Sequence, residues 1–170
     1  MPEHFRLVPE GVEVSLTPEE ALVLGDVLTV LARMGDSSDD PGAARLHPPV
    51  YLDDPEADAE WRRLAGTELS AARRADRSAV EMVLEATETA HGSGEDPVIS
   101  TGEAEALLRV LNDVRLVLAA RWGVDSPDAY DRLRPEAADV LSFLGWLVSE
   151  LAIVLGGGLS GGEEPAGPGP

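Results

Sequence analysis

Residues 140–155 form the most apolar stretch of the chain, and this stretch does most to limit the fold. It has sixteen residues, interrupted only by Ser142, Ser149 and Glu150. A helix that crosses a membrane needs about 20 apolar residues, so we expect a buried helix and not a membrane span. Its apolar residues fill one face at helical spacing and continue onto the other sides. That pattern is typical of a helix in the centre of a core or in an oligomer interface, and the second alternative predicts a homodimer through the last helix.

Capping signals predict where most helices begin. Thr17 with Glu20, and Ser100 with Glu103, have the spacing of a capping box. Asp54-Pro55, Ser126-Pro127 and Pro135 are further starts, because proline suits the first helical position. Leucine and valine recur at helical spacing after these starts, which predicts about five helices. The sequence leaves open whether Gly66 and Thr67 interrupt the helix that begins at Pro55.

Two short alternating segments precede the first helix. Residues 5–8 and 12–16 flank Pro9-Glu10-Gly11, which predicts a β-hairpin. Residues 98–100 resemble the second of these segments. They could add a third strand beside the hairpin, and the sequence leaves this open. Prolines and clustered aspartates predict a loop over residues 35–54. The fold class we expect is α+β and predominantly helical, with one domain over residues 1–155 and a disordered Gly/Pro-rich tail over residues 156–170.

The net charge of the chain limits the kind of partner that it can bind. The chain has 32 acidic residues against 13 basic ones, a formal net charge of −19, and every basic residue is an arginine. Nucleic acids and anionic membranes would be repelled, so DNA binding is the weakest hypothesis and a protein is the partner we expect. There is no cysteine, which excludes disulfides and thiolate metal sites. Together with an N-terminus that lacks an apolar signal segment, this predicts a cytoplasmic protein.

No residue pattern indicates a cofactor, a metal site or a catalytic group. His4, His47 and His91 are far apart in expected termini or loops, so we expect surface residues. The loop Asp36-Ser37-Ser38-Asp39-Asp40 resembles a calcium loop only superficially, because Pro41 and His47 stand where an EF-hand needs glycine and glutamate. The sequence therefore favours a non-enzymatic protein without deciding the point.

An arginine-rich segment stands out against the acidic background. Five of the thirteen arginines lie between residues 62 and 77. They could bind an anion or an acidic partner, because guanidinium groups bind carboxylates and phosphates in bidentate fashion. The simpler interpretation is intrahelical pairing of Asp58 with Arg62 and of Arg77 with Glu81. The residues of this predicted patch are Arg62, Arg63, Arg73, Arg74 and Arg77.

A polar interruption in the helix after Ser100 gives a second candidate site. Asn112, Asp113 and Arg115 interrupt a stripe of leucine and valine. Arg115 either reaches solvent or pairs with an acid inside the fold. We favour a structural ion pair with an acid from a loop over a catalytic role. The alternative is a small-molecule site or an unrecognised active site that includes Tyr51, which follows two prolines. That alternative requires Arg115 and Tyr51 to line one pocket.

Five motifs resemble an actinobacterial family that is known only as a domain of unknown function, from about Phe5 to Leu155. The genes of that family often neighbour the gene of the Clp-protease adaptor, near a metal-dependent isopeptidase and a sulfur-carrier protein. The resemblance therefore implies an adaptor or regulatory protein in protein turnover or in a neighbouring sulfur pathway. Its motifs are Leu7-Val8-Pro9, Leu16-Thr17-Pro18-Glu19-Glu20, Leu46-His47-Pro48-Pro49-Val50-Tyr51, Leu111-Asn112-Asp113-Val114-Arg115-Leu116 and Leu144-Gly145-Trp146-Leu147.

Overall fold

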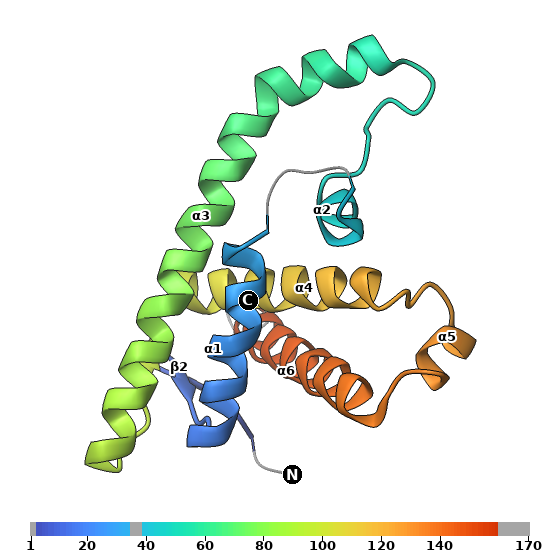
Figure 1. The fold of residues 1–170 in the computed structure, drawn as a ribbon. Helices are drawn as coiled ribbons and strands as arrows, with labels where there is room; N and C mark the ends of the chain where they lie inside the picture. Colours follow the sequence, from blue (N-terminus) through green and yellow to red (C-terminus); the bar gives the residue numbers. More distant parts are fainter. Residues whose placement is uncertain (1–2, 35–38, 160–170) are drawn as a thin grey trace, which may run out of the picture.

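The computed structural model describes residues 3–34 and 39–159, and it confirms a predominantly helical α+β fold. Six helices and a small three-stranded sheet form within the described residues (Figure 1). In chain order the elements are β1 (Phe5–Val8), β2 (Gly11–Val14), α1 (Pro18–Ala32), α2 (Pro41–Leu46), α3 (Pro55–Ser93), β3 (Val98–Ile99), α4 (Thr101–Arg121), α5 (Pro127–Asp131) and α6 (Pro135–Leu159).

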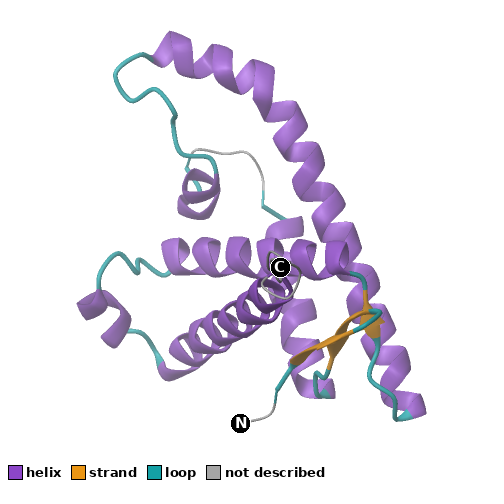
Figure 2. Cartoon of the chain, turned by 180° about the vertical axis from the view of Figure 1, so that it is seen from behind, coloured by secondary structure: helices purple, strands orange, loops and turns teal. Residues whose placement is uncertain are grey.

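The predicted hairpin forms, and the third strand joins it. β1 pairs antiparallel with β2, and β3 pairs antiparallel with the other edge of β2. Gly11 has a φ of 151°, and a Cβ there would lie 2.0 Å from the carbonyl oxygen of Ile99. Only glycine therefore lets β2 approach the end of β3 this closely. The sheet and α2 lie on opposite sides of α4 (Figures 1 and 2).

α4 is the central helix of the core. It contacts α2, α3 and α6, and its inner face includes Leu107, Leu111 and Val114, each at most 1% exposed. From α6, Leu144, Leu147 and Leu151 are fully buried against this core. α6 is also long and apolar enough to cross a membrane, over residues 135–157. Its buried leucines place one face of this helix in the core, although only 22% of the apolar window is buried.

Glu150, the one charged residue in the apolar stretch, binds the start of the chain. Its Oε1 accepts hydrogen bonds from the backbone N–H groups of His4 (2.6 Å) and Phe5 (3.2 Å). The His4 ring lies between Glu150 Oε2 and Glu20 Oε1, each 3.1 Å from a ring nitrogen, and against Trp146. His4 is only 1% exposed, so the prediction of a surface histidine was wrong here. Two carboxylates and an aromatic ring provide the partners that burial of an imidazole requires.

Two other expectations need correction. α3 runs without a break through Gly66 and Thr67, because one glycine costs a helix only about 1 kcal/mol relative to alanine. The predicted loop over residues 35–54 contains the short helix α2, which Asp40 caps by accepting a hydrogen bond from the N–H of Gly42. Residues 36–38 of the calcium-like loop lie outside the described residues. Residues 156–159 of the predicted tail belong to α6, and the rest of the tail also lies outside the described residues.

α3 consists of a longer first part, residues 55–79, and a shorter second part, residues 80–93, with different surroundings. Its 39 residues span about 58 Å at 1.5 Å per residue. Val80, Val83 and Thr87 in the second part are buried. In residues 55–79, which we call the arm, every residue is described and only Asp58 is buried. The first turns of the arm extend beyond α4 and α1 (Figure 1).

Candidate functional site

The loop before α3 is fastened to the start of the arm by one carboxylate. Asp58 Oδ1 accepts hydrogen bonds from the N–H groups of Val50 (2.7 Å) and Tyr51 (3.3 Å). Its Oδ2 lies 2.8 Å from Nε of Arg62, as the predicted i,i+4 pair requires. Burial opposes ionisation of Asp58, but these hydrogen bonds and the Arg62 charge outweigh it and lower its pKa. Asp58 thereby fixes the direction in which the proline-containing loop leaves α2.

A cleft of about 690 Å³ lies between this loop, α2 and the arm. We call it the α2–α3 cleft. One wall comes from α2 and the loop, and the other comes from the arm. Its apolar side chains are Leu46, Pro48, Pro49, Val50, Trp61 and Leu69, and its basic ones are Arg62, Arg73 and Arg74. His47, Thr67, Ser70, Gly66, Ala43 and Ala44 complete the lining.

Arg73 joins the two walls of the cleft to α4. Its Nη2 donates to the carbonyl oxygen of Leu46 (3.1 Å), and its Nη1 lies 3.2 Å from Nδ1 of His47. Its Nε lies 3.4 Å from Oδ2 of Asp113 on α4. Burial raises the pKa of Asp113, and the Arg73 charge opposes that shift. The structure thus brings together Asp113 and Arg73, which the sequence assigned to two separate candidate sites.

The five arginines of the predicted patch have different surroundings. Arg62 and Arg73 are paired as described above, and Arg63 binds Glu60 through two hydrogen bonds of 2.6 and 2.9 Å. The predicted pair of Arg77 with Glu81 does not form, although both residues are described. Arg74 is exposed and has no ion-pair partner among residues 3–34 and 39–159. Three of the five, Arg62, Arg73 and Arg74, line the cleft.

The other predicted site residues lie elsewhere. Tyr51 is 47% exposed in the loop before α3. Arg115 extends toward α6, where a Cβ at Gly145 would lie 3.8 Å from its Nη1. The Nε of Arg115 is buried without a hydrogen-bond partner in the described part of the chain. Asn112 is half-buried on α4, and neither Asn112, Arg115 nor Tyr51 lines either of the two larger pockets described here.

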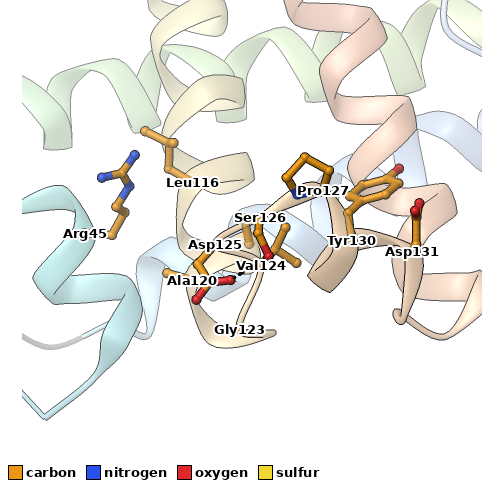
Figure 3. Close-up of a pocket in the computed structure, with 11 residues that line it drawn as sticks. Arg45, Leu116, Ala120, Gly123, Val124, Asp125, Ser126, Pro127, Tyr130 and Asp131 are labelled. Atoms are coloured by element: carbon orange, nitrogen blue, oxygen red, sulfur yellow. Dashed lines mark hydrogen bonds between the residues drawn. The ribbon is translucent and has the colours of Figure 1, made fainter.

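A second pocket, of about 900 Å³, lies where α4 ends and α5 begins (Figure 3). Arg45 reaches it from α2, and Leu116, Ala119 and Ala120 form its α4 side. Tyr130 lies at its other end, where the hydroxyl is 3.1 Å from the carbonyl oxygen of Ala138 and 2.6 Å from Oγ of Ser142. Those hydrogen bonds attach α5 to α6, which is a structural role. No sequence signal indicated this pocket, because helical spacing identified its apolar residues only as core.

Among the described residues, no group of three or more histidine, aspartate or glutamate side chains could hold a metal ion. The fold and the cleft define a predominantly helical α+β domain whose longest helix is unpacked over its first part. The chain belongs to the family described as a domain of unknown function (DUF2017), which it matches over residues 2–155. No curated protein and no solved structure matches it.

Proposed function

We propose that this protein is a non-enzymatic adaptor or regulatory protein that binds another protein through the arm and the loop before it. One observation carries this proposal. Of the ten large apolar side chains that are exposed among the described residues, five lie within residues 50–69. They are Val50, Tyr51, Leu52, Leu64 and Leu69, with exposed fractions from 44% to 80%. Exposed apolar groups that are concentrated in one region are typical of a surface that a partner covers.

The shape of the region supports the same proposal. Helices in proteins gain most of their stability from tertiary packing of an apolar face, yet the arm buries only Asp58. A helix that is held at one end by the core and exposed at the other presents a long surface to a partner. The family resemblance adds protein turnover as the process, and the absence of cysteine favours the cytoplasm as the location.

A double variant of the arm tests the proposal. Leu52→Ser with Leu64→Ser removes two of the most exposed apolar groups, at 80% and 64% exposure. We expect the wild-type chain to capture a protein from an extract of the producing cells and the double variant to lose it, with unchanged thermal unfolding. Leu22→Ser, 67% exposed on α1, is the matched control and should retain capture. Equal capture by both variants, or a chain that captures no protein, would contradict the proposal.

A homodimer through α6 is a second candidate. Ile153 is 74% exposed on this helix, although the same helix supplies fully buried leucines to the core. Light scattering should then give the mass of a dimer, and Ile153→Asp should reduce it to that of a monomer. A monomeric mass for the wild-type chain at high concentration would leave α6 as a core helix only.

A further inference from the structure

The lining of the α2–α3 cleft differs in charge from the rest of the chain. The whole chain carries 32 acidic residues and a net charge of −19. Of the described residues that line the cleft, three are arginines, one is histidine and none is acidic. Asp58 and Asp113 pair with two of these arginines, so the charge of Arg74 is left to attract a negative group, which most of the surrounding surface repels.

One of the three arginines is available to a ligand. Arg62 is engaged by Asp58, and Arg73 by Leu46, His47 and Asp113. These contacts hold the walls of the cleft in place. Arg74 is exposed, lines the same cleft and has no ion-pair partner in the described part of the chain. Its guanidinium can therefore donate hydrogen bonds to a carboxylate without breaking an existing pair.

The apolar side of the cleft limits what else the ligand carries. Trp61 and Leu69 face it from the arm, and Leu69 is 44% exposed. Pro48 and Pro49 form part of the other wall and restrict its backbone. An apolar side chain that enters here removes these surfaces from water, which stabilises the complex.

We propose that the α2–α3 cleft binds a short acidic segment of a partner protein, in which aspartate or glutamate stands next to a bulky apolar residue. The carboxylate binds Arg74, and the apolar side chain packs against Trp61 and Leu69. This inference rests on the proposed function and adds the chemistry of the partner. Inorganic phosphate would use the arginine but leave the apolar wall exposed. A nucleic acid would be repelled by the chain as a whole, which has a net charge of −19.

Fluorescence anisotropy of a labelled peptide, with the full chain, tests this inference. The probe is a ten-residue peptide that contains two Glu-Leu pairs and no basic residue. We expect saturable binding that weakens as salt is raised, because ion pairs at an accessible site are screened. A peptide with glutamine in place of glutamate should bind about ten-fold more weakly, and one with lysine should not saturate.

Matched variants locate the site. Arg74→Ala should raise the dissociation constant about five- to ten-fold, as expected for an arginine that anchors an interface. Arg132→Ala is the control, because Arg132 is exposed at the end of α5 and lines neither larger pocket. Leu69→Ala should also weaken binding of the peptide, whereas Leu22→Ala should leave its dissociation constant unchanged. Equal affinities for Arg74→Ala and Arg132→Ala would overturn the inference.

Three further outcomes would assign the cleft to another occupant and overturn it. If inorganic phosphate displaces the glutamate peptide, which the glutamine peptide fails to do, the cleft is a simple anion site. Peptide binding that appears only after residues 160–170 are removed would give the cleft to the chain's own Glu163 and Glu164. Peptide binding that disappears as the chain dimerises would give it to a second copy. If the arm double variant loses its partner while the peptide never binds, the proposed function survives and this inference fails.

Discussion

The two parts of α3 form one continuous helix, but they differ in how much of their surface the core buries. The second part places Val80, Val83 and Thr87 in the core, and these residues are at most 2% exposed. The first part has charged and small residues on most sides, and Asp58 is its one buried residue. Burial of Val80, Val83 and Thr87 stabilises the second part, which in turn provides the nucleus from which the arm extends. Continuity of a helix therefore does not require that all of it be packed.

The largest effect should come from placing the same charge in each part of α3. Val83 is 2% exposed and Leu64 is 64% exposed. Val83→Asp should lower the free energy of unfolding by more than about 4 kcal/mol, because it buries an unpaired carboxylate. Leu64→Asp should lower it by about 1 kcal/mol or less, through helix propensity alone.

Chemical denaturation monitored by circular dichroism measures both changes. Similar losses for the two variants would mean that the arm is packed in solution, and the contrast between the two parts would then be wrong. An intact fold for Leu64→Asp also makes it usable in the binding experiments above.

Two glycines sharpen the comparison at the walls of the cleft. A Cβ at Gly42 on α2 would lie 2.6 Å from Cγ1 of Val117, which is fully buried in α4. A Cβ at Gly66 in the arm would have nothing within 4 Å. Gly42→Ala should thus cost about 1–3 kcal/mol through overpacking. Gly66→Ala should stabilise the helix by up to about 1 kcal/mol.

Thermal unfolding shows whether Gly42→Ala lowers the stability of the fold. Hydrogen exchange of the arm amides shows whether Gly66→Ala raises the stability of the arm. Slower exchange confined to the arm is the result we expect for Gly66→Ala. If Gly42→Ala has no effect, α2 does not dock on α4 as described, and one wall of the cleft is misplaced.

Much of the fold follows from local sequence signals. The capping boxes at Thr17–Glu20 and Ser100–Glu103 both form, because each depends only on residues three positions apart. Signals of this range predict where elements begin and which type they are. Residues 98–100 left a third strand open, and its pairing with β2 joins Val12 to Ile99, far apart in sequence.

Features that depend on distant residues could not be predicted. His4 is buried by Glu150, 146 residues away in sequence, so its exposed position near the N-terminus was a reasonable but wrong expectation. α2 has six residues and almost no periodicity, and the fit of Gly42 against Val117 determines where it lies. Composition revealed the arginines of the cleft. Trp61 and Leu69 have the spacing of an inner helix face, but they line the cleft, whose opposite wall comes from residues 43–50 and gives no signal near them in sequence.

The smallest effects concern acid sensitivity, which should differ between the two walls of the cleft. Asp40 at the start of α2 is held by Arg121 of α4, with distances of 3.0 and 2.5 Å, and this contact lowers the pKa of Asp40 to about 2. A carboxyl group with a lowered pKa stabilises the fold at pH values above its unfolded pKa of about 4, and this contribution is lost as pH falls toward 2.

Asp40→Asn retains a capping residue and removes only the charge. Its melting temperature should be below that of the wild type at pH 7, and the difference should shrink between pH 4 and pH 2. In the arm, Glu60 also has a lowered pKa because Arg63 donates to it, but both side chains are exposed. Glu60→Gln should therefore change the melting temperature little at any pH. A difference for Asp40→Asn that stays constant from pH 7 to pH 2 would show that the shape of the cap, and not the charge on Asp40, attaches α2 to α4.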